Sequence, residues 1–111
     1  MHHTDPHCIF CKIAAGDIPA TLAYQDDQCV AFHDIHPKAP VHLLVIPRRH
    51  IASLLEVEAA DAPLLGHLLA VAARLAREHG LTAGYKTQIN TGHAGGQEVF
   101  HLHIHVLGQP Q

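Results

Sequence analysis

The segment from Val99 to Leu107 constrains the fold of this chain more than any other part of the sequence. Apolar residues and histidines alternate strictly along it, which is the period of a half-buried β-strand. Because successive side chains of a strand point to opposite faces, His101, His103 and His105 are predicted to share one face. The residues predicted to form the opposite, core face are Phe100, Leu102, Ile104 and Val106.

A glycine-rich turn at residues 92–96 precedes this strand and can present backbone N–H groups to an anion. Three imidazoles beside such a turn indicate chemistry at phosphorus. A merely solvated surface explains them less well, since histidine has no special preference for strands. A single zinc ion bound by all three is excluded, because residues i and i+4 of a strand lie about 13 Å apart and Zn–N bonds are about 2.0–2.1 Å. Two neighbouring histidines remain able to share a metal.

The composition predicts one small domain, residues 1–111, with residues 1–7 as a flexible N-terminus. The net charge is only −3 with histidine neutral, and no basic cluster exceeds Arg48–Arg49, so a nucleic-acid-binding surface is not expected. No apolar run approaches the roughly 20 residues of a membrane span, and no signal peptide precedes Cys8. A cytoplasmic protein without a membrane partner is expected, with cysteines present as thiols or metal ligands.

Local patterns predict two helices and five strands. The first helix spans residues 8–16 with Ile9, Phe10 and Ile13 facing inward, and the second runs from Asp61, its N-cap, to Gly80. Strands are expected at residues 21–25, 28–33, 41–47, 85–90 and 99–107. The long helix carries an apolar stripe made of Leu64, Leu65, Leu68, Leu69, Ala72, Leu75 and Ala76.

Residues 96–107 resemble the signature of the histidine triad (HIT) family, His-x-His-x-His flanked by hydrophobic residues. The resemblance extends through residues 31–51 and Asn90, covers residues 8–108, and is greatest to the purine nucleotide phosphoramidase (Hint-like) branch. It implies an α+β fold with a five-stranded antiparallel sheet and two helices per protomer. It also implies a homodimer in which two protomers form a continuous ten-stranded sheet.

The resemblance also implies a mechanism. His103 matches the family nucleophile, which attacks the α-phosphorus of a purine nucleoside phosphoramidate, an AMP or GMP conjugate, and forms a nucleotidyl-histidine that water cleaves. A neutral imidazole is a suitable nucleophile at pH 7. His105 is expected to hydrogen-bond the phosphate or pass a proton to the leaving nitrogen, and His42 to orient the site. No cofactor is required for this catalysis.

The nucleotide would be held by several further groups. Asn90 and the N–H groups near Gly96, Glu98 and Val99 are expected to hold the transition-state oxyanions, and Asp34 to accept hydrogen bonds from the ribose hydroxyls. Glu98 departs from the eukaryotic branch, which has a small hydroxyl residue there. The residues expected to contact the base are Ile9, Phe10, Ile13, Ile18, Phe32 and Ile35.

Two alternative functions stay open at this stage. One is hydrolysis of dinucleoside polyphosphates. The other is a zinc- or nucleotide-binding interaction module with little turnover. A rate comparison between an AMP–amine conjugate and a diadenosine polyphosphate distinguishes these possibilities.

Cys8 and Cys11 form a CxxC pair, which is typical of a metal site, a redox pair or two buried thiols. A thioredoxin-like redox pair would follow a strand, and none is predicted before Cys8. The resemblance implies His50 and His101 as further ligands of one structural zinc, as in some bacterial family members that carry the CxxC. Cys29 is expected in the core.

Overall fold

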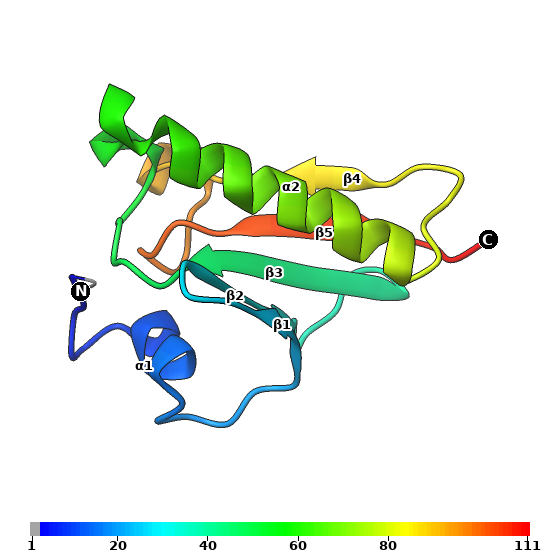
Figure 1. Cartoon of the computed structure of the whole chain (residues 1–111), viewed down its shortest axis with the longest axis horizontal. Helices are drawn as coiled ribbons and strands as arrows, with labels where there is room; N and C mark the ends of the chain where they lie inside the picture. The colour runs from blue at the N-terminus through cyan, green and yellow to red at the C-terminus, as the bar shows by residue number, and fades with distance from the viewer. Residues whose placement is uncertain (1–2) are drawn as a thin grey trace.

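The structure, a computed structural model, describes residues 3–111. Its core is one antiparallel five-stranded sheet in the order β1-β2-β3-β5-β4, accompanied by two α-helices (Figure 1). This confirms the predicted α+β fold with five strands and two helices. The elements are α1 (Ile9–Ala15), β1 (Leu22–Gln25), β2 (Cys29–His33), β3 (Val41–Pro47), α2 (Ala62–Glu78), β4 (Lys86–Gln88) and β5 (Ile104–Gly108).

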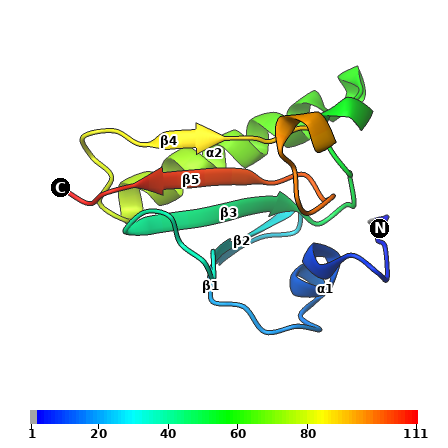
Figure 2. The same cartoon turned by 180° about the vertical axis from the view of Figure 1, so that it is seen from behind.

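The central strand β3 has the bounds that its continuous apolar run predicts. It pairs with β2 on one side and β5 on the other, and it is buried from His42 to Pro47. Alternate residues of β3 pack against different layers: Leu43 and Val45 join the core beneath α2, whereas Leu44 and Ile46 join the cluster beside α1. Figure 2 shows the sheet from behind, with α1 near the end of β3.

The prediction of a strand over residues 99–107 is wrong in its first half, since β5 begins only at Ile104. Upstream of it the backbone bonds to groups outside the sheet: the Leu102 N–H donates to the Ile51 carbonyl at 2.7 Å, and the Val99 carbonyl accepts from the Gln97 side chain at 3.0 Å. These bonds replace a ladder. Phe100, predicted to lie in the core, is therefore 44% exposed.

The helix α2 packs onto the sheet through Leu68, Val71, Ala72, Leu75 and Ala76, all of them buried. Val71 was not part of the predicted stripe, and Leu69, which was, is 49% exposed. The stretch Ala59–Glu78 has the length and mean hydropathy of a membrane span, contrary to the sequence expectation, but it includes this core-packed face. Asp61 precedes the helix without the side-chain capping bond predicted for it. Its carboxylate instead pairs with Arg49 and accepts from the Glu58 N–H at 2.9 Å.

Other boundaries differ by a few residues. Helix α1 begins after Cys8, which is its N-cap, and ends at Gly16 in the left-handed conformation (φ 84°) that favours glycine. Ile9, predicted to face inward, is 48% exposed, whereas Phe10 is buried. Three short 3-10 helices escaped prediction because they have no apolar period, and they span Leu54–Glu56, Ala59–Asp61 and His93–Gly95.

Candidate active site

A cleft of about 600 Å³ opens between α1, the end of β2 and the loop before β5. All residues that the sequence analysis assigned to phosphate, ribose or base contact lie around it, although they come from four separate segments of the chain. The sequence analysis did not single out Lys38, Lys86 and Gln88, which also line the cleft. The predicted residues there are Ile9, Phe10, Ile13, Ile18, Phe32, Asp34, Ile35, His42, Asn90, Gly96, Glu98, Val99, His103 and His105.

The tautomer of the neutral His103 ring is fixed by a backbone carbonyl. Its Nδ1 lies 2.7 Å from the carbonyl oxygen of His101, and a carbonyl can only accept. In the neutral ring Nδ1 therefore carries the proton and Nε2 carries a lone pair. The ring lines the cleft, yet it is only 7% exposed. The Phe10 ring packs edge-on against it, with centroids 5.2 Å apart.

His105 has the opposite tautomer, and a chain of two hydrogen bonds sets it. The Lys38 backbone N–H donates to His42 Nδ1 at 3.1 Å, so neutral His42 must carry its proton on Nε2. That Nε2–H lies 2.9 Å from His105 Nδ1, which accepts it. The remaining proton of His105 is therefore on Nε2, as a hydrogen-bond donor.

Burial keeps both of these rings neutral at pH 7. Loss of solvation lowers the pKa of His105 to about 4, and it also lowers the pKa of His42. The Asp34 carboxylate opposes both shifts, with its Oδ2 3.5 Å from His42 Nε2. The two hydrogen bonds that set the tautomers require both His42 and His105 to be neutral, in agreement with these pKa shifts.

The glycine-rich turn differs in detail from its predicted role. The Gly96 N–H was expected to hold an oxyanion. It instead donates to the His93 carbonyl at 3.1 Å and is not free for that role. Within residues 3–111 the N–H groups of Glu98 and Val99 have no protein acceptor and remain available. Asn90 donates through Nδ2 to the Gly95 carbonyl at 2.9 Å, which orients its side chain along the turn.

Gln97 holds this turn in place, a role that the sequence analysis did not foresee. Its buried side chain accepts from the Gly92 N–H at 2.8 Å and donates to the carbonyls of Ala52 and Val99 at 2.6 and 3.0 Å. A fully buried glutamine is uncommon and would have indicated this role, but burial cannot be read from one sequence.

A cysteine–histidine cluster, separate from the cleft, contains Cys8, Cys11, His50 and His101. The ligand atoms of these four residues all lie within 4.8 Å of one another. His101 Nδ1 is 3.3 Å from Cys8 Sγ, 3.5 Å from Cys11 Sγ and 3.3 Å from His50 Nδ1. Cys11 Sγ is 3.4 Å from His50 Nδ1. A tetrahedral zinc with ordinary bond lengths holds its ligands about 3.3–3.8 Å apart, so the spacing fits a Cys₂His₂ site.

The surroundings of this cluster also fit a metal. The His101 Nε2–H donates to the Pro47 carbonyl at 2.8 Å, which directs the Nδ1 lone pair toward the two sulfurs. Burial raises the pKa of the Cys11 thiol, so the ligating thiolate needs a nearby cation.

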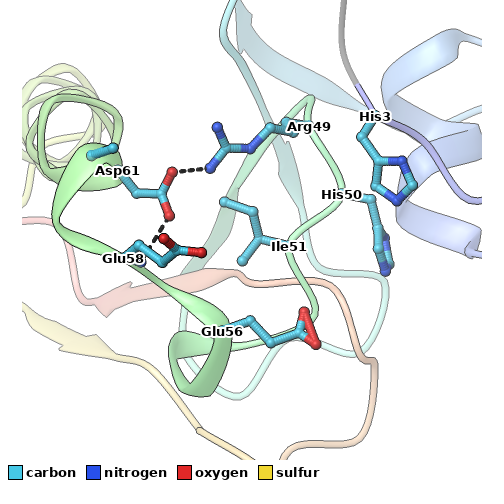
Figure 3. Close-up of a pocket in the computed structure, with 8 residues that line it drawn as sticks. His3, Arg49, His50, Ile51, Glu56, Glu58 and Asp61 are labelled. Atoms are coloured by element: carbon cyan, nitrogen blue, oxygen red, sulfur yellow. Dashed lines mark hydrogen bonds and ion pairs between the residues drawn. The ribbon is translucent and has the colours of Figure 1, made fainter.

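An open hollow of about 410 Å³ is lined by His50, one member of the cluster (Figure 3). His3 lies on one side of it, its ring centroid 6.1 Å from that of His50. The far side is acidic: Arg49 extends toward Asp61, and the carboxylates of Glu56 and Glu58 lie near the hollow.

Two other groupings of acidic and metal-binding side chains are hydrogen-bond networks. Asp26 accepts at Oδ2 from Tyr24 and His67, at 2.8 and 2.6 Å, and at Oδ1 from two backbone N–H groups. Its carboxylate is thereby saturated, and the adjacent Cys29 stays a thiol because burial raises its pKa to about 12. The grouping of Asp34 with two histidines contains His42, whose Nε2 lone pair is already lost to a proton.

Comparison with known proteins agrees with this fold. Residues 7–111 match the family described as the scavenger mRNA decapping enzyme C-terminal binding domain. The chain is 58% identical over 100 residues to an uncharacterized HIT-like protein of Synechococcus elongatus, covering 90% of this chain and 88% of that protein.

Solved structures extend the comparison. A HIT family hydrolase from Legionella pneumophila superposes with a TM-score of 0.92 at 48% identity, covering 95% of both chains. A histidine triad nucleotide-binding protein from Candida albicans gives 0.83 at 32% identity, covering 94% of this chain and 76% of that one. The fold and the cleft thus define a class of small α+β hydrolases with a histidine-lined site. The chain belongs to the histidine triad family.

Proposed function

We propose that the protein is a Hint-like nucleoside phosphoramidase, which cleaves the P–N bond of a purine nucleoside 5′-phosphoramidate through a nucleotidyl-His103 intermediate. The opposite tautomers of two adjacent rings support it most directly. His103 directs a lone pair from Nε2, whereas His105 carries its proton on Nε2, and their centroids are 5.0 Å apart. A nucleophile beside a neutral donor suits attack on a phosphorus whose oxygens need a hydrogen bond.

In the first step His103 Nε2 bonds to the α-phosphorus and the P–N bond breaks. The electron pair goes to nitrogen, and the amine takes up a proton from solvent. Positive charge develops on the His103 ring, where the bond from Nδ1–H to the His101 carbonyl becomes charge-assisted. The His105 Nε2–H and the free N–H groups of Glu98 and Val99 hold the phosphoryl oxygens.

In the second step water attacks the phosphorus of nucleotidyl-His103 and gives up a proton to solvent, the Nε2–P bond breaks with its electron pair returning to His103 Nε2, and the nucleoside monophosphate leaves. The nucleotide stays in place because Asp34 accepts from the ribose and the apolar wall packs on the base. Phe10 and Phe32, with centroids 5.4 Å apart, form the deep part of this wall. Few cationic side chains line the cleft, so it suits one nucleotide better than a polynucleotide.

The experiment that tests this function compares kcat/KM for an AMP–amine conjugate and for a diadenosine polyphosphate with the purified protein. We expect the phosphoramidate to be preferred and His103→Ala to abolish its turnover. His93→Ala is the matched control, because His93 is exposed in the same turn and does not line the cleft. A preference for the diadenosine compound would favour the polyphosphate hydrolase, and no turnover of either would favour a binding module.

The cysteine–histidine cluster supports a second proposal, a structural zinc held by Cys8, Cys11, His50 and His101. When bound, the ion would tie α1 to the loop after β3 and to the segment before β5. It would supply no chemistry to the reacting phosphorus, because its ligands are directed away from the cleft.

A homodimer is the third proposal. Strand β4 is exposed along its length, Tyr85 beside it is 41% exposed, and Leu69 projects from α2 with 49% of its surface exposed. Unpaired strand edges and apolar helix faces of this kind are commonly covered by a second copy. Leu68, which the sequence stripe had placed with Leu69, is buried within the protomer and takes no part.

A further inference from the structure

The cysteine–histidine cluster and the candidate active site share one short segment, residues 101–103. The side chain of His101 belongs to the cluster, with Nδ1 directed at the sulfurs. The backbone carbonyl of the same residue accepts the His103 Nδ1–H at 2.7 Å. One residue therefore contacts both sites, through different groups.

No sheet ladder holds this segment, because β5 starts at Ile104. Hydrogen bonds to groups outside the sheet help to hold it, from the Leu102 N–H to the Ile51 carbonyl and from the His101 Nε2–H to the Pro47 carbonyl, and the Leu102 side chain packs in the core. The position of the His101 carbonyl thus depends on how firmly the His101 side chain is fixed. Without an ion, its Nδ1 faces two thiols, which are weak hydrogen-bond donors, and the His50 ring at 3.3 Å.

A second connection passes through α1. This helix has seven residues and is too short to be stable alone. Cys8 and Cys11 lie at its start, and Phe10 between them packs against His103 at 5.2 Å and His101 at 6.0 Å. Anchoring the two sulfurs therefore fixes the aromatic ring against the nucleophile.

We propose that a metal ion in the Cys₂His₂ cluster is a positioning element for nucleotidyl transfer and more than a support for the fold. By fixing His101 and α1, the ion holds the carbonyl that keeps the His103 proton on Nδ1 and the nucleophilic lone pair on Nε2. His101 is then a positioning residue for His103. This inference rests on the proposed function for its kinetic consequence, but its structural part stands apart from turnover.

The test compares wild-type protein before and after removal of zinc by a chelator, and after zinc is added back. Ring ¹⁵N spectra report the His103 tautomer, elemental analysis reports the metal, and circular dichroism reports the fold. Loaded protein should show His103 as the Nδ1–H tautomer alone, and stripped protein a mixture of tautomers. The kcat for an AMP–amine conjugate should fall about 10- to 100-fold on stripping, the usual effect of losing an outer-sphere partner, and recover with zinc.

Variants separate positioning from stability. Cys8→Ser/Cys11→Ser should reproduce the stripped state, with no bound zinc, a mixture of His103 tautomers and a lower kcat. Cys29→Ala, at a buried thiol outside both sites, is the matched control for loss of a cysteine. A folded, stripped protein with His103 still wholly in the Nδ1–H form and with unchanged kcat would overturn the proposal, as would a protein that takes up no zinc. A tautomer change in a protein without phosphoramidase activity would retain the coupling and refute the proposed function instead.

Discussion

His42 Nε2 lies 2.9 Å from His105 Nδ1, and this contact joins two neighbouring strands at the floor of the cleft. The two residues are 63 positions apart in the sequence. Because Lys38 donates to the far nitrogen of His42, the direction of the hydrogen bond between the rings is fixed. The proton that His105 presents to the cleft is therefore controlled from the loop before β3.

Loss of His42 should release His105 from this control. His42→Ala leaves His105 Nδ1 without its donor, so the ring can place its proton on either nitrogen. We expect kcat to fall about 10- to 100-fold, as is typical for residues that orient a reacting group, while AMP binding changes little. Steady-state kinetics and calorimetric AMP binding measure both quantities. Unchanged kcat in a folded variant would contradict the proposed hydrogen-bond chain.

His103→Ala should remove turnover and also weaken the fold. Turnover should fall at least about 1,000-fold, because the covalent route is lost. The free energy of unfolding should fall by about 1–3 kcal/mol, since the ring is nearly buried and packs against Phe10. Denaturant titration and turnover assays, with His93→Ala measured beside it, check both. Near-normal turnover would be incompatible with His103 as the nucleophile.

The pH dependence of stability follows from His105. Its pKa is about 4 in the folded protein and 6.5 when solvated, so between these values the unfolded chain binds a proton that the folded chain does not. The free energy of unfolding should therefore fall as pH decreases from about 6.5, and the contribution of His105 should level off below about pH 4. Ring NMR titration gives the folded pKa. His105→Gln should remove this part of the slope, and an unperturbed midpoint near 6.5 would refute it.

Metal removal should lower thermal stability. Cys8 and Cys11 lie near one end of the sequence and His101 near the other, so one ion closes loops of about 90 residues. Elemental analysis of protein purified without chelator should give about one zinc per chain, and chelation should lower the melting temperature by several degrees. Cys8→Ser/Cys11→Ser should show the lower melting temperature without chelator. A metal-free wild type with freely titratable thiols would exclude the site.

A dimer should have twice the 12.0 kDa mass of one chain by light scattering at micromolar concentration. Leu69→Lys should weaken it, because this side chain projects from α2 away from the core. Ile35→Lys places the same charge at an exposed apolar side chain that lines the cleft, and serves as the control for association. A wild type of monomeric mass would argue against the dimer.

Sequence alone predicted the parts of the molecule that local patterning controls. Strand β3 has its expected bounds because Leu43 to Ile46 is apolar on both faces, as an interior strand requires. Strand β5 was predicted to begin five residues too early, because the bonds that replace the ladder upstream of it come from Ile51 and Gln97, which no periodicity reveals. The two histidine tautomers likewise depend on a carbonyl and a backbone N–H, and these are placed only by the folded chain.

The strand order has a consequence for how the molecule is made. Strand β5 is the last strand in the sequence, yet it lies in the sheet interior between β3 and β4. During synthesis, one edge of β3 stays unpaired and β4 has no neighbouring strand until β5 has been made and pairs with both. Pairing of β5 therefore completes the sheet and the floor of the candidate active site at the same time, through contacts between residues far apart in the sequence. Until β5 pairs, the apolar strand β3 has an unpaired edge that other chains can contact.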